Sequence, residues 1–134
     1  MFALVVSMIV TACGSRGPSF PIEASPALVE QGKAIYSAQC LTCHGDETGQ
    51  NRQFDAPPHN GEGHTWHHPD RLLFQWVLDG PPLRTAMPSF RGKLSAQEVV
   101  AVLAFIKTMW PEEIRKNQTE FSRAYEEQIK EFGE

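Results

Sequence analysis

Apolar positions recur at helical spacing in four parts of the chain, and no stretch alternates with the two-residue period of a half-buried strand. The first part begins at Ser25-Pro26, an N-cap serine followed by the proline that suits the first helical position, and is predicted to run to about residue 38. The second opens at Pro69-Asp70 and ends at Gly80. This pattern predicts an all-α fold.

The third helix is predicted to begin at Ser95, which forms a capping box with Glu98, and to stop before Pro111. The fourth lies within residues 111–134, where one face is apolar: Ile114, Phe121, Tyr125, Ile129 and Phe132. We expect this last helix to pack back on its own domain, and docking on a partner protein is the alternative. Residues 45–68 and 80–93 are rich in turn formers and are predicted to be loops.

The start of the chain is apolar and uncharged up to Cys13, and it is too short to span a bilayer. This length suits a secretory signal, and Thr11-Ala12 before Cys13, with Gly14-Ser15 after it, resembles a bacterial lipobox. We predict a lipoprotein-type signal peptide over residues 1–12 and a lipid on Cys13. The alternatives are an uncleaved apolar segment with a free thiol, or a signal that is cut elsewhere.

Residues 13–26 are rich in Gly, Ser and Pro and are predicted to form a flexible, lipid-anchored tether with little to bury. The net charge is −4, from 12 Lys and Arg against 16 Asp and Glu. Residues 14–110 hold 8 basic and 9 acidic side chains, and residues 111–134 hold 4 and 7, so most of the net charge belongs to the tail. An acidic chain argues against nucleic acid as a partner.

The chemistry is concentrated in Cys40-Leu41-Thr42-Cys43-His44, a C-x-x-C-H motif that is typical of c-type haem attachment. Two thiols three residues apart on a helical turn can reach both vinyl groups of one porphyrin, and the adjacent histidine then falls under the iron. A thioredoxin-type dithiol would follow a strand, whereas a helix precedes this motif. Half of a zinc site is a further alternative, but no cysteine follows Cys43.

Met87 is predicted to be the sixth iron ligand, because it lies in a loop and Pro88 favours an extended backbone from which its side chain can project. A thioether ligand favours ferrous iron. Two other methionines lie in the predicted signal, and Met109 lies in a helix, where core packing is expected. A methionine that fills a gap in the core is the alternative for Met87.

A helix, then C-x-x-C-H, then a Met-Pro loop and a final helix follow one another over residues 28–110, and this order resembles a bacterial class I cytochrome c. The resemblance implies a domain over residues 27–110, in which three main helices pack around one covalently bound haem c. It implies a C-terminal helical extension over residues 111–134. The first and last helices of such a domain cross, and four residues fit this crossing: Gly32, Tyr36, Val102 and Phe105.

The resemblance also implies that a proline carbonyl accepts the Nδ1–H of the haem histidine, and Pro57 matches this role, with Pro58 as the alternative. Trp66 is expected at the haem edge, with its indole N–H free to meet a propionate. Arg52 and Arg84 are candidate propionate partners, because a guanidinium matches a carboxylate bidentately. A solvated surface arginine is the alternative for each of them.

Four histidines lie near the motif's loop: His59, His64, His67 and His68. We expect them to be exposed or packed on the haem rim. The alternatives are that they ligate the iron, bind a separate metal or hydrogen-bond a propionate. A bis-histidine cytochrome, in which His64, His67 or His68 replaces Met87, is a further alternative.

We expect the protein to transfer single electrons between membrane-associated redox partners such as a terminal oxidase, and not to be an enzyme in its own right. No candidate catalytic acid/base pair stands out in the sequence. The expected location is the periplasm or the outer face of a bacterial cytoplasmic membrane. A haem enzyme subunit or gas sensor, with an open or displaceable sixth ligand, is the alternative.

Overall fold

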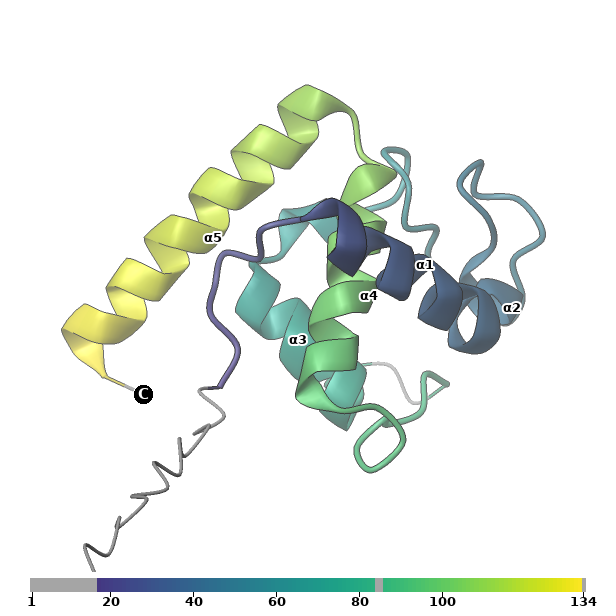
Figure 1. The fold of residues 1–134 in the computed structure, drawn as a ribbon, viewed down its shortest axis with the longest axis horizontal. Coiled ribbons are helices and arrows are strands. Elements are labelled where there is room, and N and C mark those ends of the chain that lie inside the picture. Colours follow the sequence, from purple (N-terminus) through teal and green to yellow (C-terminus); the bar gives the residue numbers. More distant parts are fainter. Residues whose placement is uncertain (1–16, 84–85, 134) are drawn as a thin grey trace, which may run out of the picture.

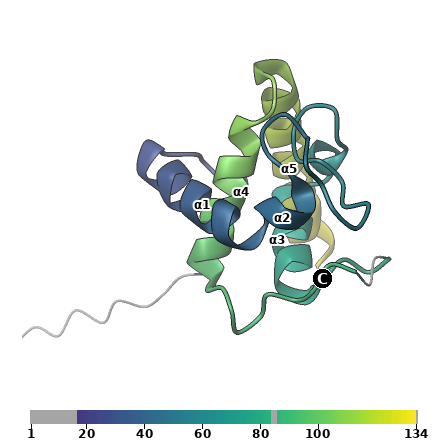
Figure 2. The same ribbon diagram turned by 90° about the vertical axis from the view of Figure 1, so that its right-hand side faces the viewer.

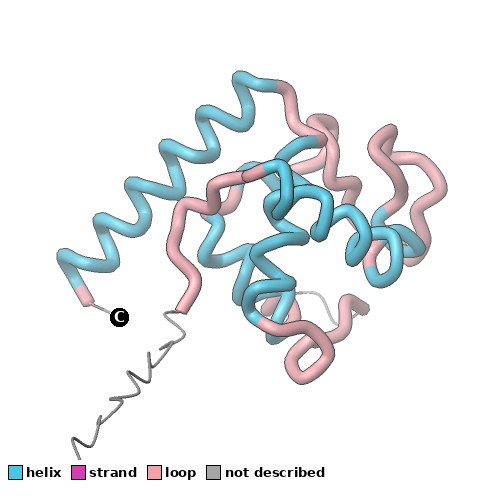
Figure 3. The backbone as a smooth tube through the Cα atoms, viewed as in Figure 1, coloured by secondary structure: helices cyan, strands magenta, loops and turns pink. Residues whose placement is uncertain are grey.

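The computed structural model describes residues 17–83 and 86–133. These residues form α1 (Pro26–Gln39), α2 (Leu41–His44), a 3-10 turn η1 (Thr65–His67), α3 (Asp70–Asp79), α4 (Ala96–Thr108) and α5 (Glu112–Phe132) (Figure 1). Figure 3 draws no strand in this part of the chain, which confirms the predicted all-α class. The predicted signal peptide, Cys13 and Arg84 lie outside the described residues.

Local signals in the sequence determine where the helices begin and end. The Ser25 hydroxyl accepts a hydrogen bond from the Leu28 N–H at 3.3 Å at the start of α1. At the start of α4, the Ser95 N–H donates to the Glu98 carboxylate at 2.8 Å, and the Glu98 N–H donates to the Ser95 hydroxyl at 3.3 Å. Gly80 ends α3 with a φ of 86°, a conformation that favours glycine. The predicted helix boundaries are confirmed to within about two residues.

Helix α1 crosses α4 at the centre of the fold (Figure 1, Figure 2). A Cβ atom at Gly32 would lie 1.9 Å from the carbonyl oxygen of Ala101, so the crossing requires glycine at this position. The Tyr36 ring packs edge-on against Phe105, with 5.3 Å between ring centroids. The expected crossing is therefore confirmed. The atom that comes close to Gly32 is the backbone carbonyl oxygen of Ala101. The side chain of Val102 is instead buried in the core.

The segment before α1 packs on the domain. The side chain of Ile22 is buried, and Phe20 packs edge-on against Phe74 with 5.5 Å between ring centroids. The Ile22 N–H donates to the Asp70 carboxylate at 2.7 Å, and the Ile22 carbonyl accepts from Lys107 Nζ at 3.3 Å. The expectation that this segment has little to bury is wrong for its described part. The composition of this segment does not reveal that α3 and α4 offer partners for two of its apolar side chains and two of its backbone groups.

A buried ion pair lies where this segment meets the helices. The carboxylate of Asp70, the first residue of α3, has no exposed surface and accepts from Lys107 Nζ at 2.8 Å and from Gln118 Nε2 at 2.7 Å. Lys107 itself is 2% exposed. Buried charges are tolerated when they are paired and hydrogen-bonded. The cluster of Ile22, Asp70, Lys107 and Gln118 therefore joins the N-terminal segment to α3, α4 and α5.

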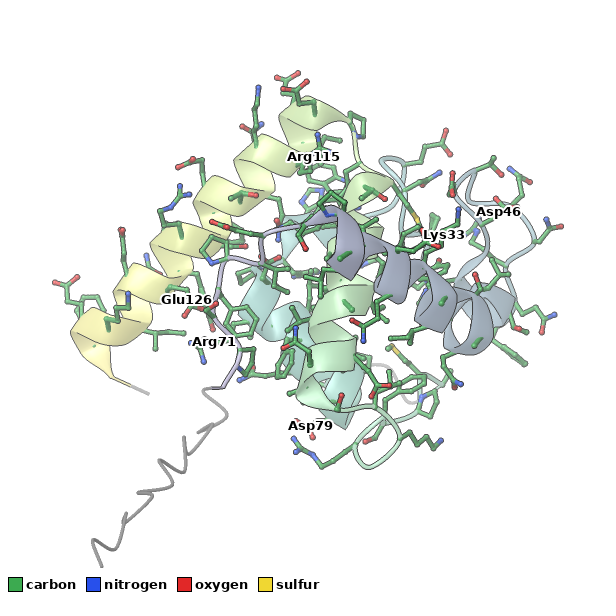
Figure 4. The ribbon with its side chains drawn as sticks, viewed as in Figure 1. Lys33, Asp46, Arg71, Asp79, Arg115 and Glu126 are labelled. Carbon is green, nitrogen blue, oxygen red and sulfur yellow. The ribbon has the colours of Figure 1, made fainter. Side chains whose placement is uncertain are left out.

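Helix α5 packs back on the domain, as expected, but it does so through polar side chains. Gln118, Ser122 and Glu126 follow one another at four-residue spacing and are its buried residues. The Ser122 hydroxyl accepts the N–H of Asp70 at 3.0 Å and so caps the first turn of α3, which has no cap of its own. The Arg71 guanidinium donates to both oxygens of Glu126, at 2.8 and 2.6 Å (Figure 4).

The apolar face predicted for this helix lies beside the buried polar one. Phe121 is 48% exposed and Phe132 is 78% exposed, although Ile114 packs against the core. The first turn of α3 offers polar partners to the buried side chains of α5, and these contacts orient α5. The helix therefore packs on the domain mainly through its polar face, and part of its apolar face stays exposed. Among the described residues, no helix is both long and apolar enough to cross a membrane.

We predict that Gly32→Ala lowers the free energy of unfolding by about 3 kcal/mol or more, because the added methyl forces α1 away from the Ala101 carbonyl. Denaturant unfolding of the haem-loaded protein measures this loss. Gly17→Ala is the matched control, since a Cβ there meets nothing within 4 Å. Equal stability of the two variants would contradict the close crossing.

We predict that Asp70→Ala costs about 3–5 kcal/mol of stability, because it leaves the buried ammonium of Lys107 without its counter-charge. Thermal unfolding measures the loss. Asp79→Ala serves as the control, since it breaks an exposed ion pair with Arg91 and should change stability little. A small effect at Asp70 would show that the buried pair is dispensable.

Candidate functional site

The cysteine motif forms a single helical turn directly after α1. The N–H groups of Cys43 and His44 both donate to the Cys40 carbonyl, at 3.2 and 2.9 Å. Both cysteines are half-buried and are not joined in a disulfide. Burial, with a smaller contribution from Cys43, raises the pKa of the Cys40 thiol to about 12. A redox dithiol needs a cysteine of lowered pKa, so Cys40 lacks the character of a thioredoxin-type nucleophile.

His44 is buried and held in one tautomer. Its Nδ1 lies 2.9 Å from the carbonyl oxygen of Pro57, so of the two prolines considered it is Pro57 that makes the contact. A carbonyl can only accept, so Nδ1 carries the proton and Nε2 keeps its lone pair. Burial lowers the pKa of His44, and the hydrogen bond to Pro57 partly opposes this shift. The result is a neutral imidazole whose Nε2 is available to a metal.

The loop that follows α2 is held by hydrogen bonds to its backbone. The Tyr36 hydroxyl of α1 donates to the carbonyl of Gly45 at 2.8 Å, and burial raises the pKa of Tyr36, so the phenol stays protonated. Arg52 donates from Nε to the Gly49 carbonyl at 2.9 Å and from Nη1 to the Ala56 carbonyl at 3.2 Å. These bonds hold the segment that places Pro57 beside His44.

His59 lies beside His44 in a way that the sequence did not reveal. The two imidazole rings are stacked, with 4.0 Å between centroids and 24° between planes. Burial, and to a lesser extent the neighbouring His44 and His64, lowers the pKa of His59 well below its ordinary value, so this ring is neutral too. Its position two residues after Pro57 was the one available signal.

Met87 lies in the loop between α3 and α4, as predicted, and its side chain is half-buried. The far end of this loop is attached to α3. The N–H of Phe90 donates to the Val77 carbonyl at 3.1 Å, and the N–H of Arg91 donates to the Leu78 carbonyl at 3.0 Å. In Figure 1 and Figure 2 the described part of this loop is drawn lower than α2, the helix that bears His44.

Residues 27–106 match the family described as cytochrome c oxidase, cbb3-type, subunit III. The chain belongs to this cytochrome c family. Members of the family hold covalently bound haem c, and the single C-x-x-C-H motif of this cytochrome accounts for one haem.

Two curated relatives are dehydrogenases. The cytochrome is 35% identical over 86 residues to the quinohemoprotein alcohol dehydrogenase of Comamonas testosteroni, and 31% identical over 85 residues to the 1-butanol dehydrogenase (cytochrome c) of Thauera butanivorans. The matches cover 64% and 63% of this chain but 12% of each relative, so the cytochrome corresponds to a small part of those proteins. No solved structure shows a significant match.

The residues of the cytochrome fit haem c. Two uncrosslinked thiols lie on one turn, and the neighbouring imidazole is neutral with a free Nε2. Cys40, Cys43 and His44 could therefore hold the group. In the part of the chain that the structure describes, no three His, Cys, Asp or Glu side chains are grouped to hold a metal ion, as a zinc site would require.

The other residues considered from the sequence have different surroundings. The indole N–H of Trp66 donates to the Gly61 carbonyl at 3.3 Å, and its contact with a propionate stays a prediction. Arg52 braces the loop, as described above, and its contact with a propionate stays a prediction. So does the contact of Arg84, which lies outside the described residues.

The three remaining histidines surround η1. The ring of His67 packs on Trp66 with 3.8 Å between centroids, and His68 meets Trp76 edge-on at 4.6 Å. His64 lies edge-on to His68 at 5.9 Å. Aromatic contacts account for the positions of these histidines, and iron ligation by any of them stays an untested alternative.

We predict that Tyr36→Phe lowers the free energy of unfolding by about 1 kcal/mol, because the carbonyl of Gly45 loses its buried donor. Chemical denaturation of the haem-loaded protein measures this change. Tyr125→Phe removes the hydroxyl of a half-buried residue on α5 and should leave stability unchanged. Equal effects of the two substitutions would show that the Tyr36 hydroxyl does not hold the loop.

Proposed function

We propose that this cytochrome carries single electrons between redox partner proteins, with haem c attached through Cys40 and Cys43 and its iron ligated by His44 and Met87. When bound, haem c takes up one electron as ferric iron becomes ferrous and releases it in the reverse step. The observation that carries the proposal is the state of His44. It follows the second thiol directly, it is buried, and the Pro57 carbonyl leaves its Nε2 unprotonated.

Met87 is the sixth ligand in this proposal. It lies in a loop attached to α3, and Pro88 favours an extended backbone there. Met109 offers a poor alternative, because it packs against the core at the end of α4. With His44 and Met87 both ligating, the iron would have no open position for a substrate, and this arrangement would favour electron transfer over catalysis at the iron. A thioether ligand favours the ferrous state and so raises the reduction potential.

The redox partners that we propose are a dehydrogenase or a terminal oxidase. The relatives from Comamonas testosteroni and Thauera butanivorans are dehydrogenases, and the family is described as an oxidase subunit. Residues 14–110 hold 8 basic and 9 acidic side chains, so this part of the chain is nearly neutral. We therefore do not propose a strong electrostatic attraction to either partner.

We place the cytochrome at the outer face of a bacterial cytoplasmic membrane, or in the periplasm, with a lipid on Cys13. Ile22 is held on the domain by Asp70 and Lys107. Nine peptide units separate it from Cys13 and reach about 30 Å when extended. A lipid at this position would therefore keep the domain close to the membrane surface.

We predict that Met87→Ala abolishes the weak long-wavelength absorption band of ferric iron with methionine ligation. We also expect the reduction potential to fall by an amount on the order of 100 mV, because the thioether that favours ferrous iron is lost. Absorption spectroscopy and a potentiometric titration measure the two changes.

The control is Met109→Leu, which replaces a methionine packed in the core and should leave band and potential as they are. An unchanged spectrum in Met87→Ala would contradict methionine ligation and favour a bis-histidine cytochrome. Carbon monoxide tests the remaining alternative, an open or displaceable sixth position. Prompt binding of carbon monoxide to the untreated ferrous protein would favour a haem enzyme or a gas sensor.

A further inference from the structure

The closest ring contact of His44 is with a second imidazole. His59 stacks on it with 4.0 Å between centroids. A side chain that stacks on His44 cannot also lie across an iron from it, so His59 does not compete for the sixth position. Its place in the site calls for another role.

His59 is itself held from two directions. Its Nδ1 lies 2.8 Å from the hydroxyl of Thr65, and its carbonyl accepts the indole N–H of Trp110 at 2.7 Å. Both partners are buried, Thr65 at 7% exposure and Trp110 at 2%. The edge of the Tyr36 ring lies nearby, with 6.0 Å between centroids. His59 thus presents a fixed flat surface to His44, anchored by η1 and by the end of α4.

A single hydrogen bond does not fix the plane of an imidazole. The contact between His44 Nδ1 and the Pro57 carbonyl sets the direction of one N–H, but the ring can still rock about that line. A flat group against the ring face opposes this rocking. The orientation of an axial imidazole determines how its orbitals overlap with those of the iron, so the group that fixes the plane tunes the iron.

We propose that His59 is a positioning residue of the haem site, which fixes the plane of the His44 imidazole through ring stacking. This inference rests on the proposed ligation of iron by His44. The restraining group is the flat ring of His59, which is held in place by its contacts with Thr65 and Trp110.

The test compares variants of the full-length, haem-loaded protein. His59→Leu removes the flat ring and keeps a similar volume, whereas His59→Phe keeps a ring that can stack. Haem methyl shifts in the proton NMR spectrum and the g values of ferric iron report the plane of the axial ligand, and the reduction potential reports the consequence. We expect His59→Leu to shift all three. His59→Phe keeps the ring but loses the contact with Thr65, so it should shift them less than His59→Leu.

His67→Leu is the matched control, because His67 lies in the same segment and packs on Trp66. It should leave all three readouts unchanged. Three results would overturn the inference: an unchanged His59→Leu, a His59→Phe altered as much as His59→Leu, or an equal effect of His67→Leu. Should His59→Leu fail to assemble, Thr65→Val removes one restraint on His59 and should move the same resonances less far, and an unchanged spectrum there would overturn the inference.

The wild-type spectrum distinguishes this inference from the proposed function. A wild type without histidine ligation of its iron would overturn both together. A wild type with normal histidine and methionine ligation, combined with an unchanged His59→Leu, would overturn the positioning role alone.

Discussion

The carboxylate of Asp70 has no exposed surface and takes hydrogen bonds from Ile22, Lys107 and Gln118. These three residues belong to segments that lie far apart in the sequence. Leaving such a carboxylate unpaired would be costly, so each donor must reach it in the folded state. Buried ion pairs contribute less to stability than their geometry suggests, because both charges lose their water. We infer that this one mainly specifies which segments meet, and it does so where the N-terminal segment enters the fold.

The cofactor site depends on the same packing, although no side chain of the site touches Asp70. Helix α4 lies under α1 at Gly32 and ends at Thr108. Trp110 follows two residues later, and its indole N–H reaches the His59 carbonyl. His59 and Pro57 both belong to a loop without regular structure, and together they contact the imidazole of His44. A loop can hold the His44 imidazole this firmly because its backbone groups are bonded to the helices around it.

Helix α5 lies beyond residues 27–106, the part that matches the family. It stabilises that part by supplying polar groups that the domain lacks, such as the hydroxyl of Ser122 at the start of α3. Arg71 and Glu126 extend the contact through a bidentate pair. A tail with a clear apolar pattern therefore binds through its polar side, and part of its apolar side, including Phe121, stays exposed.

The sequence by itself determined the helices, because caps such as Ser95 and Gly80 act within a few residues of the chain. It also determined the haem motif, since the spacing of Cys40 and Cys43 is a local property. Only the tertiary structure decided which polar groups pair across long separations and which ring lies on His44. Asp70 and Gln118 carry no local signal for these roles, and the only local signal of His59 is its position two residues after Pro57. Their partners come from other parts of the chain, and a buried polar group or ring takes the partner that packing brings near.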